Sequence, residues 1–333
     1  MGTPCQRARR SPSPLAARAR ALDETPRPLS AGSLAALAAS LVSQNLGAAI
    51  AKSLFPRVGV EGMTALRIGL SAVLLLAFWR PWRRPLARRD VANVVAYGAM
   101  LGGMNLCIYH AFGRIPIGIA TAIETTGPLV VVLAASRRAL DVAWVLLALA
   151  GLAMLLPLAA DRPLDPVGLL FAFGAAASWA LYIVFGKRVS GLASGQAVSL
   201  GMLVVAMFAV PIGVAQAGSA MLAPAVLLAG LGVAVLSSAV PYSLEMAALR
   251  RMPRQVFGIL VSATPAVGAG CGAVVLGERL SAWQWLAIAC IIAASAGGAA
   301  SGRRADAAPA GPARPGERSA GGSRLPNDSR TPD

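Results

Sequence analysis

RIPIGIATAIETTGP occupies residues 114–128, and RMPRQVFGILVSATP occupies residues 251–265. In both stretches a proline stands two positions after an arginine, and a second proline follows twelve positions later. The offset of 137 positions between the stretches also carries Asp141 onto Glu278. A repeat of this length, with proline inside apolar sequence, is typical of internally duplicated membrane proteins. The pattern therefore predicts two related halves.

The second proline of each stretch, Pro128 or Pro265, lies inside a segment apolar enough to cross a bilayer. Proline frees backbone groups of a spanning helix, and these are tolerated only where protein or a water-filled cavity satisfies them. We therefore predict a helix break with a gating role at both positions, close to a transport pathway.

The composition predicts an all-α polytopic membrane protein. Of the 333 residues, 56% are hydrophobic and 13% are charged, whereas soluble domains typically contain about 25% charged residues. With about 20 apolar residues per span, the chain divides into roughly ten transmembrane helices. The predicted spans are 30–53, 61–79, 91–112, 117–135, 140–158, 167–187, 196–216, 223–247, 255–276 and 282–301.

The net charge of +16 is concentrated in alternate loops, after the second, fourth, sixth and eighth predicted spans. Because positive residues favour the cytoplasmic side, this alternation places both termini in the cytoplasm. Charge placed in this way indicates a membrane topology, so no nucleic-acid partner is predicted. The residues concerned are Arg80, Arg83, Arg84, Arg88, Arg89, Arg137, Arg138, Lys187, Arg188, Arg250, Arg251 and Arg254.

Five spans in each half is an odd number, so the halves must enter the membrane in opposite senses. Inverted repeats of this kind are common in secondary transporters. The first five-helix repeat is predicted over residues 30–158 and the second over residues 166–301. Residues 1–29 and 302–333 are polar and rich in Pro and Arg, which predicts disordered cytoplasmic tails.

Signatures of enzymes are missing. The chain has four Cys with no CxxC pair and one His, so neither a disulfide framework nor a metal site is predicted. It also has no phosphate-binding loop and no nucleophile elbow. We predict no cofactor and no enzymatic activity, so transport would run on an ion or substrate gradient. A membrane-embedded enzyme and a non-transporting receptor are the alternative classes, but the acids within the spans are few and scattered.

Ionisable groups inside a span are costly, about 2.5–3.5 kcal/mol each on insertion scales. Glu124 and Arg67 both lie well within predicted spans. Glu124 is either a structural partner of Arg67 or a substrate and proton site, and the two roles are compatible. Poor hydration favours the neutral form of a carboxylate and a nearby cation favours the charged form, so Glu124 could exchange protons near neutral pH. Glu245 could instead form an interfacial ion pair, and Lys52 could extend to the outer interface.

Several uncharged polar residues complete the predicted site. Asn105 and Tyr109 are separated by one i,i+4 step, so they share a helix face. Gln44 and Asn45 could bridge helices or line a polar cavity, and Tyr242 could line the pathway. The predicted substrate and proton pathway consists of Glu124, Arg67, Glu245, Lys52, Asn105, Tyr109, Tyr242, Gln44 and Asn45.

Seven short motifs carry a family resemblance: AKSLFP at 51–56, GMTALR at 62–67, LGGMN at 101–105, ETTGPL at 124–129, SRR at 136–138, VPYSLEM at 240–246 and LGE at 276–278. With these motifs the chain resembles the EamA-type drug/metabolite transporter superfamily, and within it the bacterial inner-membrane threonine/homoserine exporter group. The resemblance covers about residues 30–302.

The resemblance implies two inverted five-helix repeats around a central cavity, in the bacterial inner membrane. It also implies export of small amino acids, such as threonine and homoserine, in exchange for protons. The alternative is a metabolite or drug exporter of broader specificity. The family's functional roles carry over where the motifs match, at Lys52, Arg67, Glu124 and Glu245.

Overall fold

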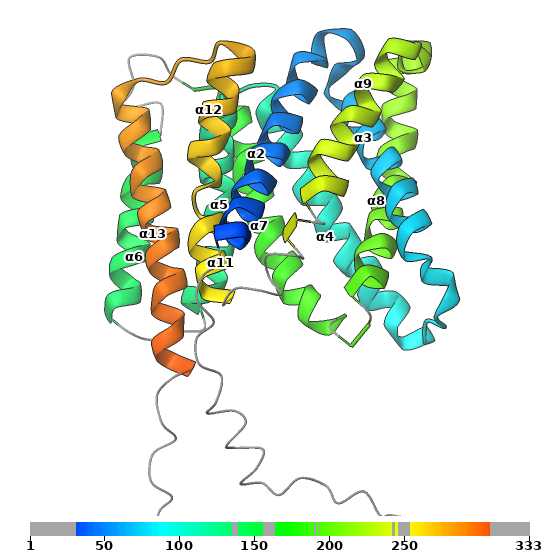
Figure 1. Ribbon diagram of the computed structural model, residues 1–333. Coiled ribbons are helices and arrows are strands. Elements are labelled where there is room, and N and C mark those ends of the chain that lie inside the picture. The colour runs from blue at the N-terminus through cyan, green and yellow to red at the C-terminus, as the bar shows by residue number, and fades with distance from the viewer. Residues whose placement is uncertain are drawn as a thin grey trace, which may run out of the picture.

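The computed structural model describes residues 31–134, 139–155, 164–189, 191–192, 194–241, 244–245 and 254–306. Throughout these ranges the regular structure is helical (Figure 1). The tail predicted at residues 1–29 lies outside the described residues, as do Tyr242 and most of the tail predicted at residues 302–333.

The first five long helices are α2 (Ala31–Ser53), α3 (Phe55–Trp79), α4 (Arg88–Phe112), α5 (Ile117–Ala134) and α6 (Ala139–Leu155). The remainder are α7 (Pro166–Arg188), α8 (Ser194–Ala217), α9 (Pro224–Ala234), α11 (Arg254–Val261), α12 (Thr264–Leu276) and α13 (Ala282–Asp306). Short 3-10 turns form η1 (Pro81–Arg83) and η3 (Gly218–Leu222), and a π-helical turn, η4 (Val235–Ala239), continues α9.

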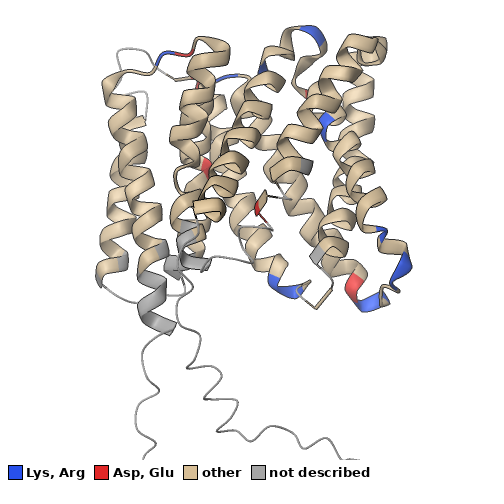
Figure 2. Cartoon of the chain, viewed as in Figure 1, with Lys and Arg blue, Asp and Glu red and all other residues tan. Residues whose placement is uncertain are grey.

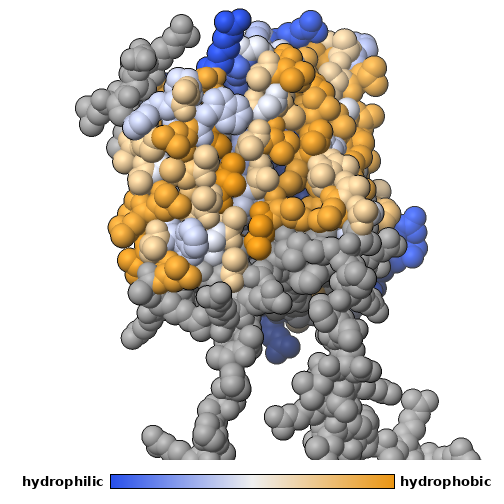
Figure 3. All heavy atoms as spheres, turned by 60° about the vertical axis from the view of Figure 1, so that its left-hand side comes forward, coloured by the Kyte–Doolittle hydropathy of each residue, from blue (hydrophilic) through white to orange (hydrophobic). Residues whose placement is uncertain are grey.

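The helices have the length and surface of a multi-pass membrane protein, as the composition predicted. Within the described residues, six segments are long and apolar enough to cross a membrane: Ala31–Ser53, Phe55–Arg83, Arg88–Phe112, Pro166–Arg188, Gly195–Leu222 and Ile259–Leu276. Shorter apolar helices cover Ile117–Val131, Val142–Leu155, Pro224–Ser238 and Ala282–Gly298. Large apolar side chains such as Val274, which is 86% exposed, cover the lateral surface (Figure 3). In Figure 2 the charged side chains gather mainly at the two ends of the bundle.

Proline acts differently at the two positions that the sequence repeat relates. Pro265 is the second residue of α12, where its ring fits the first turn of a helix, and residues 262–263 separate α12 from α11. The break predicted at Pro128 is wrong, because α5 continues through it from Ile117 to Ala134. A missing N–H removes one helical hydrogen bond, which a helix packed on several sides tolerates.

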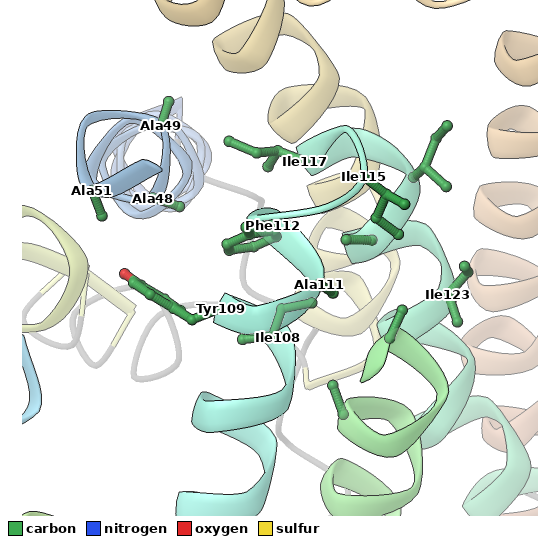
Figure 4. Close-up of a cluster of buried hydrophobic side chains, with 14 of the residues drawn as sticks. Ala48, Ala49, Ala51, Ile108, Tyr109, Ala111, Phe112, Ile115, Ile117 and Ile123 are labelled. Carbon is green, nitrogen blue, oxygen red and sulfur yellow. The ribbon is translucent and has the colours of Figure 1, made fainter. Parts of the chain in front are cut away.

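Helices far apart in sequence pack together across the bundle. Along one edge α6 lies beside α13, and along the other α3 lies between α8 and α9 (Figure 1). Between these edges, α4 contacts α7 and α8, α5 contacts α7 and α12, and α2 contacts α12 and η4. The largest buried cluster joins α2, α4, α5, α12 and α13, and Figure 4 shows part of it.

Small residues permit these close contacts. A Cβ placed on Gly127 of α5 would overlap the backbone carbonyl oxygen of Ala176 in α7. A Cβ on Gly118 would overlap Ala269 of α12 in the same way. Small residues allow helix backbones to approach closely in membranes, where packing drives helix association. Gly127 thus fixes the distance between α5 and α7 three residues after Glu124.

Asp165 determines where α7 begins. Its carboxylate accepts a hydrogen bond of 2.9 Å from the backbone N–H of Val167, as an N-cap residue does, and an ion pair of 3.2 Å from Arg114. The N–H of Val167 and the neighbouring Arg114 hold the pKa of Asp165 below its ordinary value. The pair joins the α4–α5 connection to the start of α7.

Candidate functional site

The structure brings Arg67, Asn105 and Tyr109 together between α3 and α4. An η N–H of Arg67 donates to Oδ1 of Asn105, whose Nδ2 donates to the carbonyl of Leu101 at 2.7 Å. The guanidinium carbon lies 4.5 Å from the centroid of the Tyr109 ring, a cation–π contact. The i,i+4 spacing thus presents both α4 side chains to the same cation. We call these three residues the arginine group.

The arginine group is almost completely buried. Arg67 and Asn105 are each 7% exposed and Tyr109 is 3% exposed. Two of its polar atoms, Nε of Arg67 and the hydroxyl oxygen of Tyr109, have no hydrogen-bond partner among the described residues. A buried charge is costly unless it is paired, and here an amide oxygen and an aromatic face compensate it only in part.

Glu124 lies on α5 near this group and is partly buried. The charge of Arg67 acts on its carboxylate, and the charge of Glu124 acts in turn on Cys107 of α4. The ion pairs within the described ranges do not include a direct contact between Glu124 and Arg67. Pro128 lacks an N–H, so the backbone carbonyl of Glu124 also loses its helical donor. The carboxylate of Glu124 thus lies within electrostatic reach of a buried cation.

Glu245 forms a second, separate polar group. Its carboxylate accepts a hydrogen bond of 3.0 Å from the hydroxyl of Ser40 in α2. Ser43, one turn further along α2, donates at 2.8 Å to the carbonyl of Leu236 in η4. The interfacial ion pair considered for Glu245 would involve Arg250 or Arg251, which lie outside the described residues.

Lys52 and Glu278 form an ion pair of 2.7 Å at the opposite end of α2. The ammonium group also donates at 2.8 Å to the carbonyl of Ile115, and the second carboxylate oxygen accepts at 3.0 Å from the N–H of Ile117. We call these four residues the outer clasp, after the side of the membrane on which the predicted topology would place them. Lys52 is only 20% exposed in its side chain, so it does not extend freely to the interface.

A helix C-cap positions Glu278 for this contact. Gly277 has a positive φ of 68° and its N–H bonds to the carbonyl of Ala273, as in the αL C-cap motif, while the N–H of Glu278 bonds to the carbonyl of Gly272. A Cβ on Gly272 would overlap the carboxylate of Glu278. The LGE motif thus turns the chain so that the carboxylate reaches both Lys52 and the first N–H of α5.

The outer clasp is expected to stabilise the fold. Lys52→Met should lower the free energy of unfolding by about 1–3 kcal/mol, because it leaves a largely buried carboxylate without its cation. Thermal unfolding of the purified protein in detergent measures the change. Arg57→Met, which removes an exposed cation from the adjacent helix, is the control and should change little. Equal stability of the two variants would contradict a stabilising role.

The other predicted residues do not join the arginine group. Asn45 is buried where α2 meets α12, and its Nδ2 donates at 2.9 Å to the carbonyl of Leu41 in its own helix. Gln44 is exposed. His110 stacks on Phe171 and lies 3.8 Å from the carboxylate of Glu61. In the part of the chain that the structure describes, no three His, Cys, Asp or Glu side chains gather as metal ligands would.

Sequence reasoning missed Glu278 and the serines that join α2 and α3 to η4. Ser71 of α3 and Ser238 of η4 are both buried and share a hydrogen bond of 2.8 Å. Small hydroxyl residues inside spans commonly hydrogen-bond between membrane helices, and that rule is a signal for these positions. For Glu278 the signal was its correspondence with Asp141 in the repeat.

The fold and the buried charges define a polytopic helical membrane protein with a polar interior. Residues 166–297 match the EamA-like transporter family. The chain is 47% identical over 262 residues to the threonine/homoserine exporter RhtA of Escherichia coli strain K12, covering 78% of this chain and 89% of that protein. It is 48% identical over 259 residues to the exporter of the same name from Salmonella typhimurium strain SL1344, covering 78% and 88%. This chain therefore belongs to the EamA-like transporter family.

A protein of known crystal structure shares the fold. It is 22% identical to this chain, with a TM-score of 0.56 over 82% of this chain and 99% of its own. At this identity the likeness concerns the arrangement of the helices alone.

Proposed function

We propose that this chain exports small amino acids such as threonine and homoserine across the bacterial inner membrane by proton antiport. The exporters that it resembles at 47–48% identity support the substrate class. The observation that carries the proposal is the arginine group beside Glu124. A buried cation and a nearby carboxylate on different helices are the two charges that a zwitterionic amino acid needs.

The packing of the helices supports ten spans in two inverted repeats, α2–α6 and α7–α13. The second, fourth and fifth helices of one half each contact their counterparts, as α3 with α8, α5 with α12 and α6 with α13. Three further contacts have an exchanged counterpart: α4 with α7 matches α9 with α2, α5 with α7 matches α12 with α2, and α4 with α8 matches α9 with α3. Such exchange is expected of two halves related by a pseudo-twofold axis.

Transport would follow from rocking of these halves about the arginine group. The substrate carboxylate binds Arg67 and the ammonium binds Glu124, which takes a proton when the substrate leaves. The outer clasp joins α2 and α5 of the first half to the end of α12 in the second, so it closes the outer side and separates when that side opens. With both termini cytoplasmic, substrate enters from the cytoplasm and protons return in its place.

Reconstitution into liposomes loaded with labelled threonine tests the proposal. Efflux should exceed that of protein-free liposomes, rise severalfold when the outside is made acidic, and lose this acceleration when an uncoupler collapses the gradient. An efflux rate that does not depend on the pH gradient would contradict proton coupling. Absence of flux for threonine, homoserine and other small amino acids would favour a metabolite or drug exporter of broader specificity.

A further inference from the structure

Two donors in the arginine group lack acceptors. Nε of Arg67 and the hydroxyl of Tyr109 are buried without a hydrogen-bond partner among the described residues. More than about 90% of buried polar groups in proteins are hydrogen-bonded, and exceptions call for an explanation. The guanidinium Nε–H can only donate, and the phenol O–H can donate as well. The complement of both groups is therefore an acceptor.

The surrounding contacts hold both donors in place. One η nitrogen of the guanidinium donates to Asn105, and the guanidinium carbon lies over the Tyr109 ring. The Tyr109 ring packs between Phe55 and Phe112, at centroid distances of 6.1 and 5.6 Å. In Figure 4 the Tyr109 hydroxyl points away from Ile115 and Ile123, toward the side of the view where the helix that carries Ala51 lies. Neither donor can easily turn to another partner.

The charges select the kind of acceptor. The positive guanidinium favours an anion, and hydrogen bonds between charged groups are about twice as strong as neutral ones. The nearby carboxylate of Glu124, whose interaction with Arg67 is attractive, disfavours a dianion such as phosphate and favours a ligand that carries its own cation. A carboxylate attached to an ammonium-bearing carbon satisfies all three groups.

We propose that Nε of Arg67 and the hydroxyl of Tyr109 form a subsite for the substrate carboxylate. Tyr109 is the residue that selects an unesterified carboxylate over its ester. The subsite rests on the proposed export of amino acids and specifies its chemistry. An ester of the same amino acid offers only a neutral carbonyl oxygen, so it forms weaker hydrogen bonds to these two donors while its ammonium still reaches Glu124.

Tyr109→Phe tests the subsite, because it removes one oxygen and keeps the ring beneath the guanidinium. The unfolding temperature of the purified protein is measured at increasing concentrations of threonine or of threonine methyl ester, since ligand binding raises this temperature. In the wild-type protein threonine should stabilise at lower concentration than the ester. In the variant the half-maximal concentration for threonine should rise about tenfold or more, the factor of one charge-assisted hydrogen bond, and that for the ester should rise clearly less, because its bond to Tyr109 is a neutral one.

Tyr97→Phe is the matched control, because it removes a hydroxyl that bonds to Tyr182 instead, and it should leave both ligands unaffected. Equal weakening of threonine and ester in Tyr109→Phe, or no weakening of threonine, would overturn the subsite even if the wild-type protein transports threonine. If threonine neither stabilises the wild-type protein nor is transported by it, the subsite and the proposed function are both wrong.

Discussion

Glu124→Gln is expected to reduce threonine efflux by about a hundredfold or more, the effect of removing one partner from a desolvated charge pair. Glutamine keeps the size and hydrogen-bonding capacity of the side chain but can neither carry a negative charge nor release a proton. The substrate ammonium then meets no counter-charge, and the return of the carrier no longer requires a proton. Both the loss of ammonium binding and the loss of proton coupling affect the step in which Glu124 exchanges a proton for the substrate.

Efflux from liposomes, normalised to the amount of reconstituted protein, measures this loss, and thermal unfolding in detergent establishes that the variant is folded. Glu61→Gln is the control, because Glu61 lies beside His110 and apart from the arginine group. It should retain most of the wild-type rate and its response to pH. Wild-type efflux from the Glu124→Gln protein would assign Glu124 a structural role only.

Gly127→Ala is expected to lower the free energy of unfolding by about 1–3 kcal/mol, the range for overpacking a well-packed interior. The added methyl group meets the backbone carbonyl of Ala176, which cannot rotate away as a side chain would. α5 and α7 must then separate, and Glu124 moves with α5. Loss of efflux should accompany the loss of stability.

Gly270→Ala in α12 provides the comparison for this variant. A Cβ on Gly270 meets no atom within 4 Å, and alanine favours a helix over glycine by up to about 1 kcal/mol. This variant should unfold at or slightly above the wild-type temperature. If the two variants unfold at the same temperature, the close approach of α5 to α7 does not depend on Gly127.

Hydrophobicity alone predicted the helical class and the bounds of several long helices. A membrane helix needs a long apolar run, so α2, α4, α7 and α8 begin and end within a few residues of the predicted spans. Interruptions were harder to predict, because they depend on contacts between distant segments. The break between α11 and α12 lies beside Pro265, where local sequence predicted one. The π-turn η4 instead meets α2 through a hydrogen bond from Ser43 to Leu236, 193 positions away, and local sequence gives no sign of that partner.

The cost of burying charge in lipid revealed the central residues of the site. Arg67 and Glu124 stand out because an isolated charge inside a span requires a reason, and Asn105 and Tyr109 followed from helical spacing. Gln44 and Asn45 were treated alike, although consecutive residues on a helix point in directions about 100° apart. The structure accordingly buries one and exposes the other. Glu278 was passed over because charge in a connecting loop costs little and reveals no partner.

The Glu278 carboxylate serves two elements at once, balancing the Lys52 ammonium and capping the first turn of α5. Because both oxygens belong to one carboxylate, withdrawal of Glu278 removes the partner of the cation and of the helix end together. In the proposed transport cycle, opening of this side would therefore cost both contacts, and their joint strength would keep the entrance closed to ions between turnovers.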